Sequence, residues 1–437
     1  MIAAGLGVEL TTVQESFLHF VWNYQRYDHA DLRSTQDLPI EIYKIGNHNT
    51  DAGPDFLNAK LSLAGIQWHG SVEIHVNSSD WNHHNHHLDE KYNNVILHVV
   101  WNHDVDCYRS DGEVLPVLEL KNRVPIALID RYKKLVYDPH EIPCQDQFSQ
   151  VRDIDKLSML DQMAIERLRR KSTLILDRLE RNKGSWEETV YQLVAQSFGF
   201  KKNADSMLKL AEVLSHKVLL KQQTDRLDTE ALLFGVAGFL DQTGLDEYAE
   251  KLTERYAYLS KKYRTGDFQM LRVEWNFLRM RPGNFPTVRL AELSAFIFAH
   301  AKFFHLILHH TSIKELRQLF EAELSPYWQV HYDFGKKSTR PHHGLGSASI
   351  DVLLINTVAP VLAAYSQYVG DELYMDRAVD LLHQLKAEKN RVIEAWQNMG
   401  MSAKTAFDSQ ALLELKNEFC LKKKCLSCKI GLKLISD

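Results

Sequence analysis

Cysteine is scarce in this chain, with five residues among 437. That number is too small for disulfides to hold together a chain of this length. The thiols are also unevenly spread, because Cys107 and Cys144 stand alone whereas Cys420, Cys425 and Cys428 lie within the last 20 residues. This clustering indicates metal ligation rather than disulfide pairing.

The sequence also lacks an excess of charge of one sign. Its 52 Lys and Arg residues nearly balance 57 Asp and Glu residues, which gives a formal net charge of −5. Such a chain has no global attraction for nucleic acid or acidic lipid. A polyanionic partner would need a local basic patch.

Targeting and membrane signals are missing as well. Residues 1–10 are apolar but have no basic start and reach Glu9 early, which is unlike a secretory signal. No apolar run approaches the roughly 18 residues of a membrane span. We therefore expect a cytoplasmic protein with no membrane partner.

The residues that are present give an ordinary globular composition, with 45% hydrophobic and 25% charged residues. A chain of this length predicts two or three domains. Residues 11–27 have apolar side chains at helical spacing behind two candidate caps, Thr11 and Thr12, and Glu15 lies on this helix. Short β-type runs then follow at 40–45, 56–63, 66–76, 94–101 and 114–120.

Beyond residue 153 the strand pattern gives way to long amphipathic stretches, which predict helices at 154–182, 186–198, 203–217, 229–240, 245–262 and 287–308. A proline-containing link at 138–143 separates the two kinds of pattern. The expected fold class is α+β. A mixed β-sheet domain with one entering helix occupies 1–138, and a mostly α-helical domain with the cysteine cluster occupies 139–437.

The runs 56–63 and 66–76 predict a β-hairpin, closed by a three-residue loop at 63–65 with Gly65 in the left-handed conformation. That loop would pair Ser62 with Ile66. Counting outward from this pair places Asp55 opposite Glu73 on a shared face. Strand alternation puts His75 on the same face as Glu73.

Asp55 and Glu73 are therefore candidate ligands for a divalent cation. Two neighbouring carboxylates repel unless one is protonated or a cation lies between them, and hard oxygen ligands suit Mg²⁺ or Mn²⁺. Such a metal could polarise a phosphoryl oxygen and activate a bound water. The alternative is that Asp55 caps a turn and Glu73 is a solvated strand residue.

These residues resemble the PD-(D/E)XK nuclease superfamily, since Pro54-Asp55 opens one strand and Glu73-Ile74-His75 lies on the next. The resemblance implies a restriction-endonuclease-like core in which Asp55 and Glu73 hold the metal. It also matches Glu15 to the early acidic residue of that group. His75 stands where the group has Lys, so a neutral imidazole would act there as base or ligand.

A histidine-rich segment at 78–92 follows the second strand of the hairpin. His84 and His86 could add metal ligands, position a water or contact a phosphate. A separate zinc or non-haem iron site is a second possibility. A solvated polar turn anchored by Trp81 and Tyr92 is the third.

The chain as a whole resembles a bacterial family catalogued only as domain of unknown function 2851. The resembling stretches are NTDAGPDF at 49–56, GSVEIH at 70–75, SDW at 79–81 with His84 and His86, 95–100, NFP at 284–286 with 289–291, NTVAP at 356–360, and the terminal cysteine cluster. The resemblance covers nearly the full length and implies no established activity.

The terminal cysteines offer three thiolates, and their Cys-x2-Cys element resembles a zinc or iron–sulfur knuckle. Cys144 is the first candidate for a fourth ligand and a His is the second; three reduced thiols are the alternative. Candidate basic patches lie at Lys422–Lys424 with Lys429, at Arg279, Arg281 and Arg289, and at 336–343. Each could contact phosphates or be ordinary solvated surface.

Three functions are compatible with these features. The first is a metal-dependent phosphodiesterase acting on DNA or RNA, with Asp55 and Glu73 on the metal and His75 or His84 assisting water activation. The second is a non-catalytic nucleic-acid-binding or assembly protein with a structural metal knuckle. The third is a transition-metal enzyme acting on a small molecule. The oligomeric state is not readable from the sequence.

Overall fold

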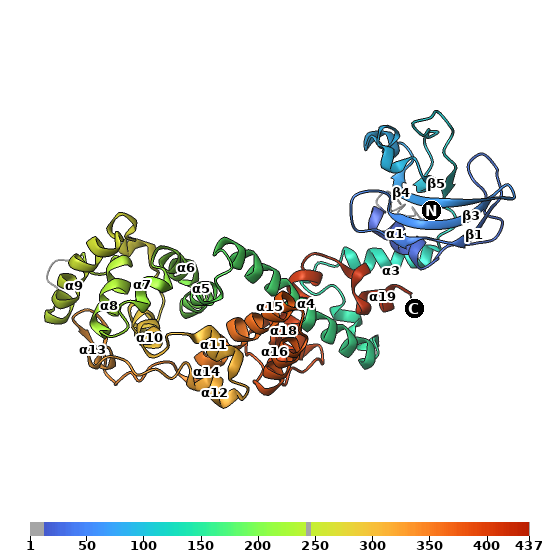
Figure 1. The fold of residues 1–437 in the computed structure, drawn as a ribbon. Coiled ribbons are helices and arrows are strands. Elements are labelled where there is room, and N and C mark those ends of the chain that lie inside the picture. The colour runs from blue at the N-terminus through green and yellow to red at the C-terminus, as the bar shows by residue number, and fades with distance from the viewer. Residues whose placement is uncertain (1–12, 242–245, 437) are drawn as a thin grey trace, which may run out of the picture. The chain divides into compact units, whose positions relative to one another are not determined.

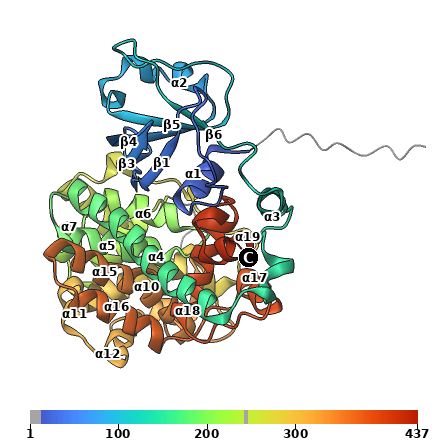
Figure 2. The same cartoon turned by 90° about the vertical axis from the view of Figure 1, so that its right-hand side faces the viewer.

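The computed structural model describes residues 13–241 and 246–436 (Figures 1 and 2). Within these ranges the chain forms two compact units, one of residues 13–159 with 416–436 and one of residues 160–415. The candidate caps Thr11 and Thr12 and the apolar start at 1–10 lie outside the described residues. The fold is mixed, with a curled N-terminal sheet and a helical remainder, as the sequence predicts in outline.

The units divide the chain differently from the expected ranges 1–138 and 139–437. Residues 139–159 and the terminal segment 416–436, which carries three of the cysteines, belong to the unit of the sheet. Helix α19 (Lys429–Ser436) packs on α3 (Ile126–Val136), and the Arg131 guanidinium donates to the carbonyl of Ile435 at 2.8 Å. Sequence periodicity cannot show such a return, because it reports only local spacing.

The sheet of the first unit has strands β1 (Ile40–Lys44), β3 (Phe56–Leu63), β4 (Ile66–Asn77), β5 (Val95–Asn102) and β6 (Val117–Glu119) in that order, and β2 (Asn47–His48) also pairs with β3. β3 is antiparallel to both β1 and β4, whereas β4, β5 and β6 are parallel to one another. The observed strands match the predicted runs closely, apart from the shorter β6. Helix α1 (Glu15–Asn23) packs against β4 (Figure 2).

The hairpin turn differs from the expected one. Leu63 pairs with Ile66, so the turn has only two residues, Ala64 and Gly65, both at positive φ. This is the backbone that a tight two-residue hairpin requires. The predicted three-residue loop and its pairing of Ser62 with Ile66 are therefore wrong.

A β-bulge at Asn58 compensates for that difference. Asn58 has a φ of 59°, and the register shifts between Ala59, paired with Gly70, and Phe56, paired with Val72. In a regular strand, residues three positions apart face opposite sides of the sheet. The extra residue shifts this alternation, so that Phe56 and Ala59 are both buried. Beyond the bulge Asp55 is again next to Glu73, as predicted.

A crossover of short helical turns joins the parallel strands β4 and β5. It contains α2 (Asp80–His83), η1 (His86–Leu88) and η2 (Glu90–Tyr92). The first unit also contains the short helix η3 (Gln145–Gln150), the last turns of the chain at η9 (Cys425–Ser427) and α19, and the start of α4 (Asp153–Arg181), which carries the chain into the second unit.

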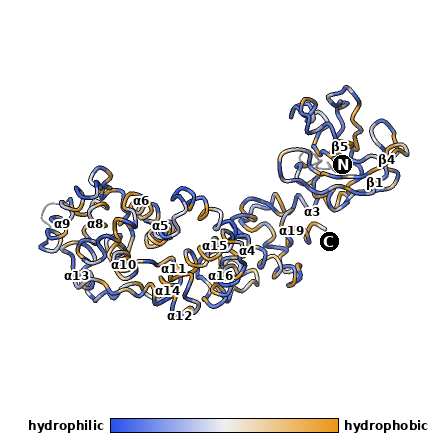
Figure 3. Tube along the Cα trace, in the orientation of Figure 1, coloured by the Kyte–Doolittle hydropathy of each residue, from blue (hydrophilic) through white to orange (hydrophobic). Residues whose placement is uncertain are grey.

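The second unit is helical, and the trace alternates between hydrophobic and hydrophilic segments (Figure 3). Its helices are α5 (Trp186–Phe198), α6 (Ala204–Val213), α7 (His216–Leu220), α8 (Arg226–Val236), α9 (Glu247–Tyr263), α10 (Pro286–Ala299), α11 (Phe303–His309), α12 (Ile313–Gln318), α13 (Pro326–Val330), α14 (Ser347–Leu353), α15 (Ala359–Val369), α16 (Leu373–Gln384), α17 (Arg391–Asn398) and α18 (Ala406–Glu414). Short helices η4 (Gly266–Phe268), η5 (Arg272–Glu274) and η6 (Pro282–Asn284), a hairpin of β7 (His331–Asp333) with β8 (Lys336–Lys337), and π-helical turns η7 (Leu354–Val358) and η8 (Leu415–Cys420) complete the described elements.

Two predicted helices are each divided in the structure. The range 203–217 contains α6 and the start of α7, separated at Leu214, which has extended backbone angles. The range 287–308 contains most of α10 and α11, which meet at an angle of 74°. Apolar periodicity continues across both breaks, and it therefore does not reveal them.

The expectation that no apolar segment is long enough to span a membrane is not met at one place. The continuous helix Ser347–Val369 has 23 residues and a mean hydropathy of 1.6 over its most apolar window, and 67% of that window is buried inside the protein. The bent pair α10 and α11 passes the same length and composition test if the two are joined. In the structure, α10 and α15 are largely buried within the second unit.

The bulge generates a prediction about stability. Asn58 is exposed and left-handed, a conformation that costs a β-branched residue roughly 1–2 kcal/mol and costs Gly little. We expect Asn58→Val to lower the free energy of unfolding by that amount in urea denaturation. The matched variant Asn58→Gly should stay within about 0.5 kcal/mol of the wild type. Equal stability of the Val variant would contradict the bulge geometry.

Candidate metal centre

Asp55 and Glu73 are joined through each other's main chain. The Asp55 amide donates to Glu73 Oε2 at 3.1 Å, and the Ile74 amide donates to Asp55 Oδ2 at 2.9 Å. Glu73 is only 5% exposed. The predicted juxtaposition of the two residues on the hairpin is therefore present, and one oxygen of each carboxylate is free of these contacts.

Helix α1 adds two side chains to the Asp55 carboxylate. His19 Nε2 lies 3.2 Å from Asp55 Oδ2 and 3.6 Å from Glu15 Oε1. One potential ligand atom from each of Glu15, His19 and Asp55 lies within 4.8 Å of the others. His19 Nε2 is buried and lies against these two carboxylates without a hydrogen bond of good geometry.

His19 was not among the residues selected from the sequence. Its signal was the spacing Glu15-x3-His19, which places two possible ligands on one face of a helix. Burial alone would lower the pKa of His19, but the carboxylates of Asp55 and Glu15 raise the pKa overall. Imidazole and carboxylates therefore attract one another here.

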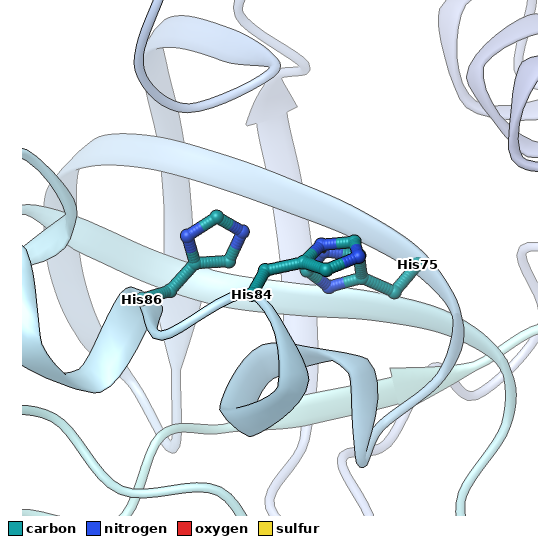
Figure 4. A group of neighbouring side chains, drawn as sticks. All are labelled: His75, His84 and His86. Carbon is teal, nitrogen blue, oxygen red and sulfur yellow. The ribbon is translucent and has the colours of Figure 1, made fainter.

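Three histidines form a second group of possible ligands beside Glu73. One ring nitrogen from each of His75, His84 and His86 lies within 4.8 Å of the other two (Figure 4). Glu73 Oε1 lies 3.3 Å from His86 Nε2 and 3.6 Å from His75 Nε2. Since Glu73 Oε2 accepts from the Asp55 amide, this one carboxylate connects the two groups.

The ring nitrogens of His75 have close partners on both sides. Nδ1 lies 2.9 Å from His98 Nε2, and Nε2 lies 3.0 Å from His84 Nδ1. If His75 Nδ1 donates to His98, then Nε2 carries a lone pair that faces His84 and His86. Two nitrogens bound to one metal at about 2.1 Å would lie roughly 3.0–3.4 Å apart, so the observed separation from His84 fits shared ligation.

Burial keeps the imidazoles of His75 and His98 neutral. It lowers the pKa of His75 to about 3, with His86 and His84 adding to the effect. His98, 0% exposed, has a pKa well below the ordinary 6.5 for the same reason. Burial also raises the pKa of Glu73, and the nearby Asp55 charge raises it further. Neutral imidazoles and crowded carboxylates are the protonation states that a bound cation favours.

The crossover segment fixes the positions of His84 and His86. Asp80 Oδ2 accepts from the Asn77 amide at 2.9 Å, and the Trp81 indole donates to the Tyr108 carbonyl at 2.9 Å. The His86 ring stacks on Tyr92 with centroids 3.8 Å apart. Trp81 is fully buried, as predicted for a core anchor, whereas Tyr92 is half-buried and His84 is exposed. The histidine group is thus held from inside and open to solvent at His84.

The four candidate cysteine ligands also come together. Cys144, Cys420, Cys425 and Cys428 are all buried and line a single cavity. Cys107 lies elsewhere in the unit, where its thiol donates to the Ser78 carbonyl at 3.1 Å. The sequence offers Cys144 or a histidine as the fourth ligand. Of these two candidates, it is Cys144 that lines the cavity.

One of the three candidate basic patches surrounds a pocket. Arg279, Arg281 and Arg289 line a pocket of about 510 Å³ in the second unit together with Lys201 and Lys202. Arg289 is itself buried and pairs with Glu292 at 2.7 Å. The other two patches also have local partners. Lys422 pairs with Glu418, Lys429 donates to Ser158 Oγ at 2.7 Å, Lys336 pairs with Asp333 at 3.0 Å, and His342 lies 2.9 Å from Glu292.

Comparison with known proteins assigns the chain to a family but to no reaction. A family model described as "Protein of unknown function (DUF2851)" matches residues 15–391. No curated protein matches the sequence. No solved structure matches it either.

The buried histidines generate a prediction about pH. As the pH falls through 6.5, the unfolded chain protonates its histidines, whereas folded His98 stays neutral. This residue therefore lowers the free energy of unfolding by on the order of 2 kcal/mol between pH 7 and pH 5. When a chelator is present to remove metal ions, His98→Phe should reduce the pH dependence of the unfolding free energy by about that amount.

The matched control for this measurement is His83→Gln, since the His83 side chain is 71% exposed. It should leave the pH dependence unchanged. A His98→Phe variant with the wild-type pH dependence would show that His98 is not held neutral by burial.

Proposed function

The chain belongs to the DUF2851 family of proteins of unknown function, and we propose that it is a divalent-metal-dependent phosphodiesterase that acts on nucleic acid. The observation that carries this proposal is the meeting of Asp55, Glu73 and Glu15 with His19 at one end of the hairpin. Three carboxylates from separate elements, converging in a partly buried site, are characteristic of a Mg²⁺ or Mn²⁺ position.

The arrangement of the elements supports the resemblance to the PD-(D/E)XK nucleases. A helix carrying Glu15 precedes a hairpin that has Asp55 just before its first strand and Glu73 in its second, and a crossover leads to the parallel strand β5. This is the order on which the resemblance rests. We infer a restriction-endonuclease-like core for the first unit on that basis.

His75 occupies the position at which that superfamily has Lys. A neutral imidazole cannot supply the positive charge of a lysine, but it can bind a metal or accept a proton from water. Because His84 and His86 stand beside it, we propose that the three histidines replace the single cation. They would hold a second, softer metal position that suits Mn²⁺ or Zn²⁺.

The roles of the residues follow from their positions. Asp55, Glu15 and His19 would hold the first metal, and Glu73 would connect it to the histidine group. A bound divalent ion would polarise the phosphodiester and lower the pKa of a water. In the alternative in which the three histidines hold no second metal, His84, the exposed member of the group, would accept the proton of that water, with His75 fixing its ring orientation through the 3.0 Å contact.

The nucleic-acid part of the proposal rests on the pocket in the second unit. The five cationic side chains of Lys201, Lys202, Arg279, Arg281 and Arg289 line it. The Arg289 guanidinium lies 4.5 Å from the centre of the Phe200 ring, and Asn284 Oδ1 accepts from its Nη2 at 2.5 Å. Arg289 also pairs with Glu292 at 2.7 Å, so the phosphate contacts would come mainly from Lys201, Lys202, Arg279 and Arg281. The pocket would supply the phosphate contacts that the overall charge of the chain does not.

The first test of this proposal is cleavage by the full-length protein with Mg²⁺, Mn²⁺ or Zn²⁺ and single- or double-stranded DNA or RNA. Asp55→Asn removes a metal ligand at nearly constant volume. We expect it to lower turnover by at least about a hundredfold, while folding and nucleic-acid affinity change little. Asp51→Asn, in the same loop but exposed, is the matched control and should cleave as the wild type does.

Two outcomes would contradict the proposal. Turnover that is the same in Asp55→Asn and Asp51→Asn would assign the cleavage to a contaminant or another site. Absence of both cleavage and binding across the panel would favour an assembly protein in its place.

The second test concerns the basic pocket. Arg279→Ala with Arg281→Ala should weaken nucleic-acid binding by about tenfold and make the affinity less dependent on salt, because phosphate contacts release counterions. The matched control is Lys314→Ala with Lys404→Ala, which removes two exposed cations of the same unit that do not line the pocket. Equal loss of affinity in both pairs would show that total charge, and not the pocket, determines binding.

A further inference from the structure

Four of the five cysteines surround one cavity in the first unit. Cys144, Cys420, Cys425 and Cys428 are each 7–8% exposed, and the walls between them are largely apolar, with Leu135 and Phe419 among them. None of the four is in a disulfide. Four reduced thiols from distant parts of the sequence therefore face a common, solvent-poor space.

The thiols are close enough to influence one another electrostatically. Burial raises the pKa of Cys420, and the neighbouring Cys144, Cys428 and Cys425 raise it further. Cys144 responds in the same way to burial and then to Cys428 and Cys425, and its pKa rises to about 12.

The backbone around the cavity is built for close approach. A Cβ on Gly431 would lie 2.2 Å from the carbonyl oxygen of Cys425, so only glycine allows the start of α19 to pack on the knuckle. Lys424 lines the cavity, and Lys416 and Lys423 act to lower the pKa of Cys420 and Cys425 respectively. These lysines would offset part of the negative charge of four thiolates.

The spacing of the thiols distinguishes between two kinds of centre. Thiolates on one zinc ion, at bonds of about 2.3 Å, lie roughly 3.8 Å apart. Among the described residues, the groups of three ligand atoms within 4.8 Å of one another contain no thiol. An iron–sulfur cluster spreads its cysteine ligands over several iron atoms and holds them farther apart.

We propose that Cys144, Cys420, Cys425 and Cys428 are the ligands of an iron–sulfur cluster that fastens the terminal segment 416–436 to the sheet unit. Each thiol loses one proton when it binds iron. The cluster connects positions 144 and 420 at a point where few polar contacts do so: Lys423 donates to the carbonyls of Asp138 and His140, and Lys416 pairs with Glu141. This inference does not depend on the proposed phosphodiesterase activity.

The position of the knuckle gives the cluster a structural consequence. Leu426 and Ser427, between the last two cysteines, line a pocket with His19 and His48. Segment 416–436 therefore forms part of the wall beside the Glu15, His19 and Asp55 group. Loss of the cluster should release this segment while the sheet stays folded.

The test is metal and sulfide analysis of the full-length protein, purified without oxygen, chelator or affinity metal and reconstituted with Fe²⁺ and sulfide or, separately, with Zn²⁺. We expect iron and sulfide in about equal amounts, roughly two or four of each per chain, with visible absorption that bleaches on reduction. Cys425→Ala with Cys428→Ala should lose both. Cys107→Ala removes the remaining buried thiol of the same unit and is the matched control, which should retain both.

Limited proteolysis provides a readout that does not require the double variant to fold. In the wild type, removal of the cluster by oxidation and chelation should expose segment 416–436 to cleavage and leave the sheet protected. About one zinc and no iron per chain would overturn the cluster in favour of a single-ion site. Wild-type protein with neither metal after reconstitution, or iron content unchanged in the double variant, would overturn the metal centre altogether.

Discussion

Two hydrogen bonds between carboxylates and main-chain amides hold the candidate centre together. The Asp55 carboxylate accepts a hydrogen bond from the Ile74 amide, and the Glu73 carboxylate accepts one from the Asp55 amide. Bonds of this kind to charged acceptors are stronger than bonds between neutral groups. They direct both carboxylates inward, where solvation would otherwise draw them apart. Glu73 Oε1 is left to His86 and His75. Asp55 Oδ2 accepts from Ile74 and also contacts His19, so Oδ1 is the Asp55 oxygen that these contacts leave free. The rest of the site is assembled around this pair.

The pair exists because a local irregularity restores the strand register. The two-residue turn at Ala64 and Gly65 would by itself put Asp55 out of step with Glu73, and the left-handed residue Asn58 adds the one position that corrects it. Bulges are frequent where a side chain must be redirected next to a functional site. A small departure from regular β-structure thus determines where the first carboxylate points.

Burial gives the cluster its chemical character. His75 and His98 lie among apolar strands and stay neutral, while Glu73 is pushed towards its protonated form by the same low polarity. A cluster of this kind is unfavourable by itself, because several polar atoms share few protons; His98 Nδ1, for example, makes no hydrogen bond. Cation binding would satisfy part of this demand, which is why metal binding is the chemistry that the arrangement supports best.

The sequence by itself determined the strands of the hairpin, the helical nature of the second half, and the chemical identity of most of the candidate ligands. These features depend on local spacing. Side chains alternate along a strand, which puts Glu73 and His75 on one face, and Cys-x2-Cys places two thiols a short turn apart. The juxtaposition of Asp55 with Glu73 was also correct, although the turn and the bulge were each missed and their errors cancelled.

Only the tertiary structure decided which distant residues these side chains contact. His98 joins His75 across parallel strands, 23 positions away in sequence, and His19 reaches Asp55 from a separate element, helix α1. Cys144 meets the terminal cysteines because α19 returns to pack on α3. Periodicity reports what a residue faces within its own element. Contacts between distant elements depend on how their buried faces pack against one another, and local spacing holds no information about that.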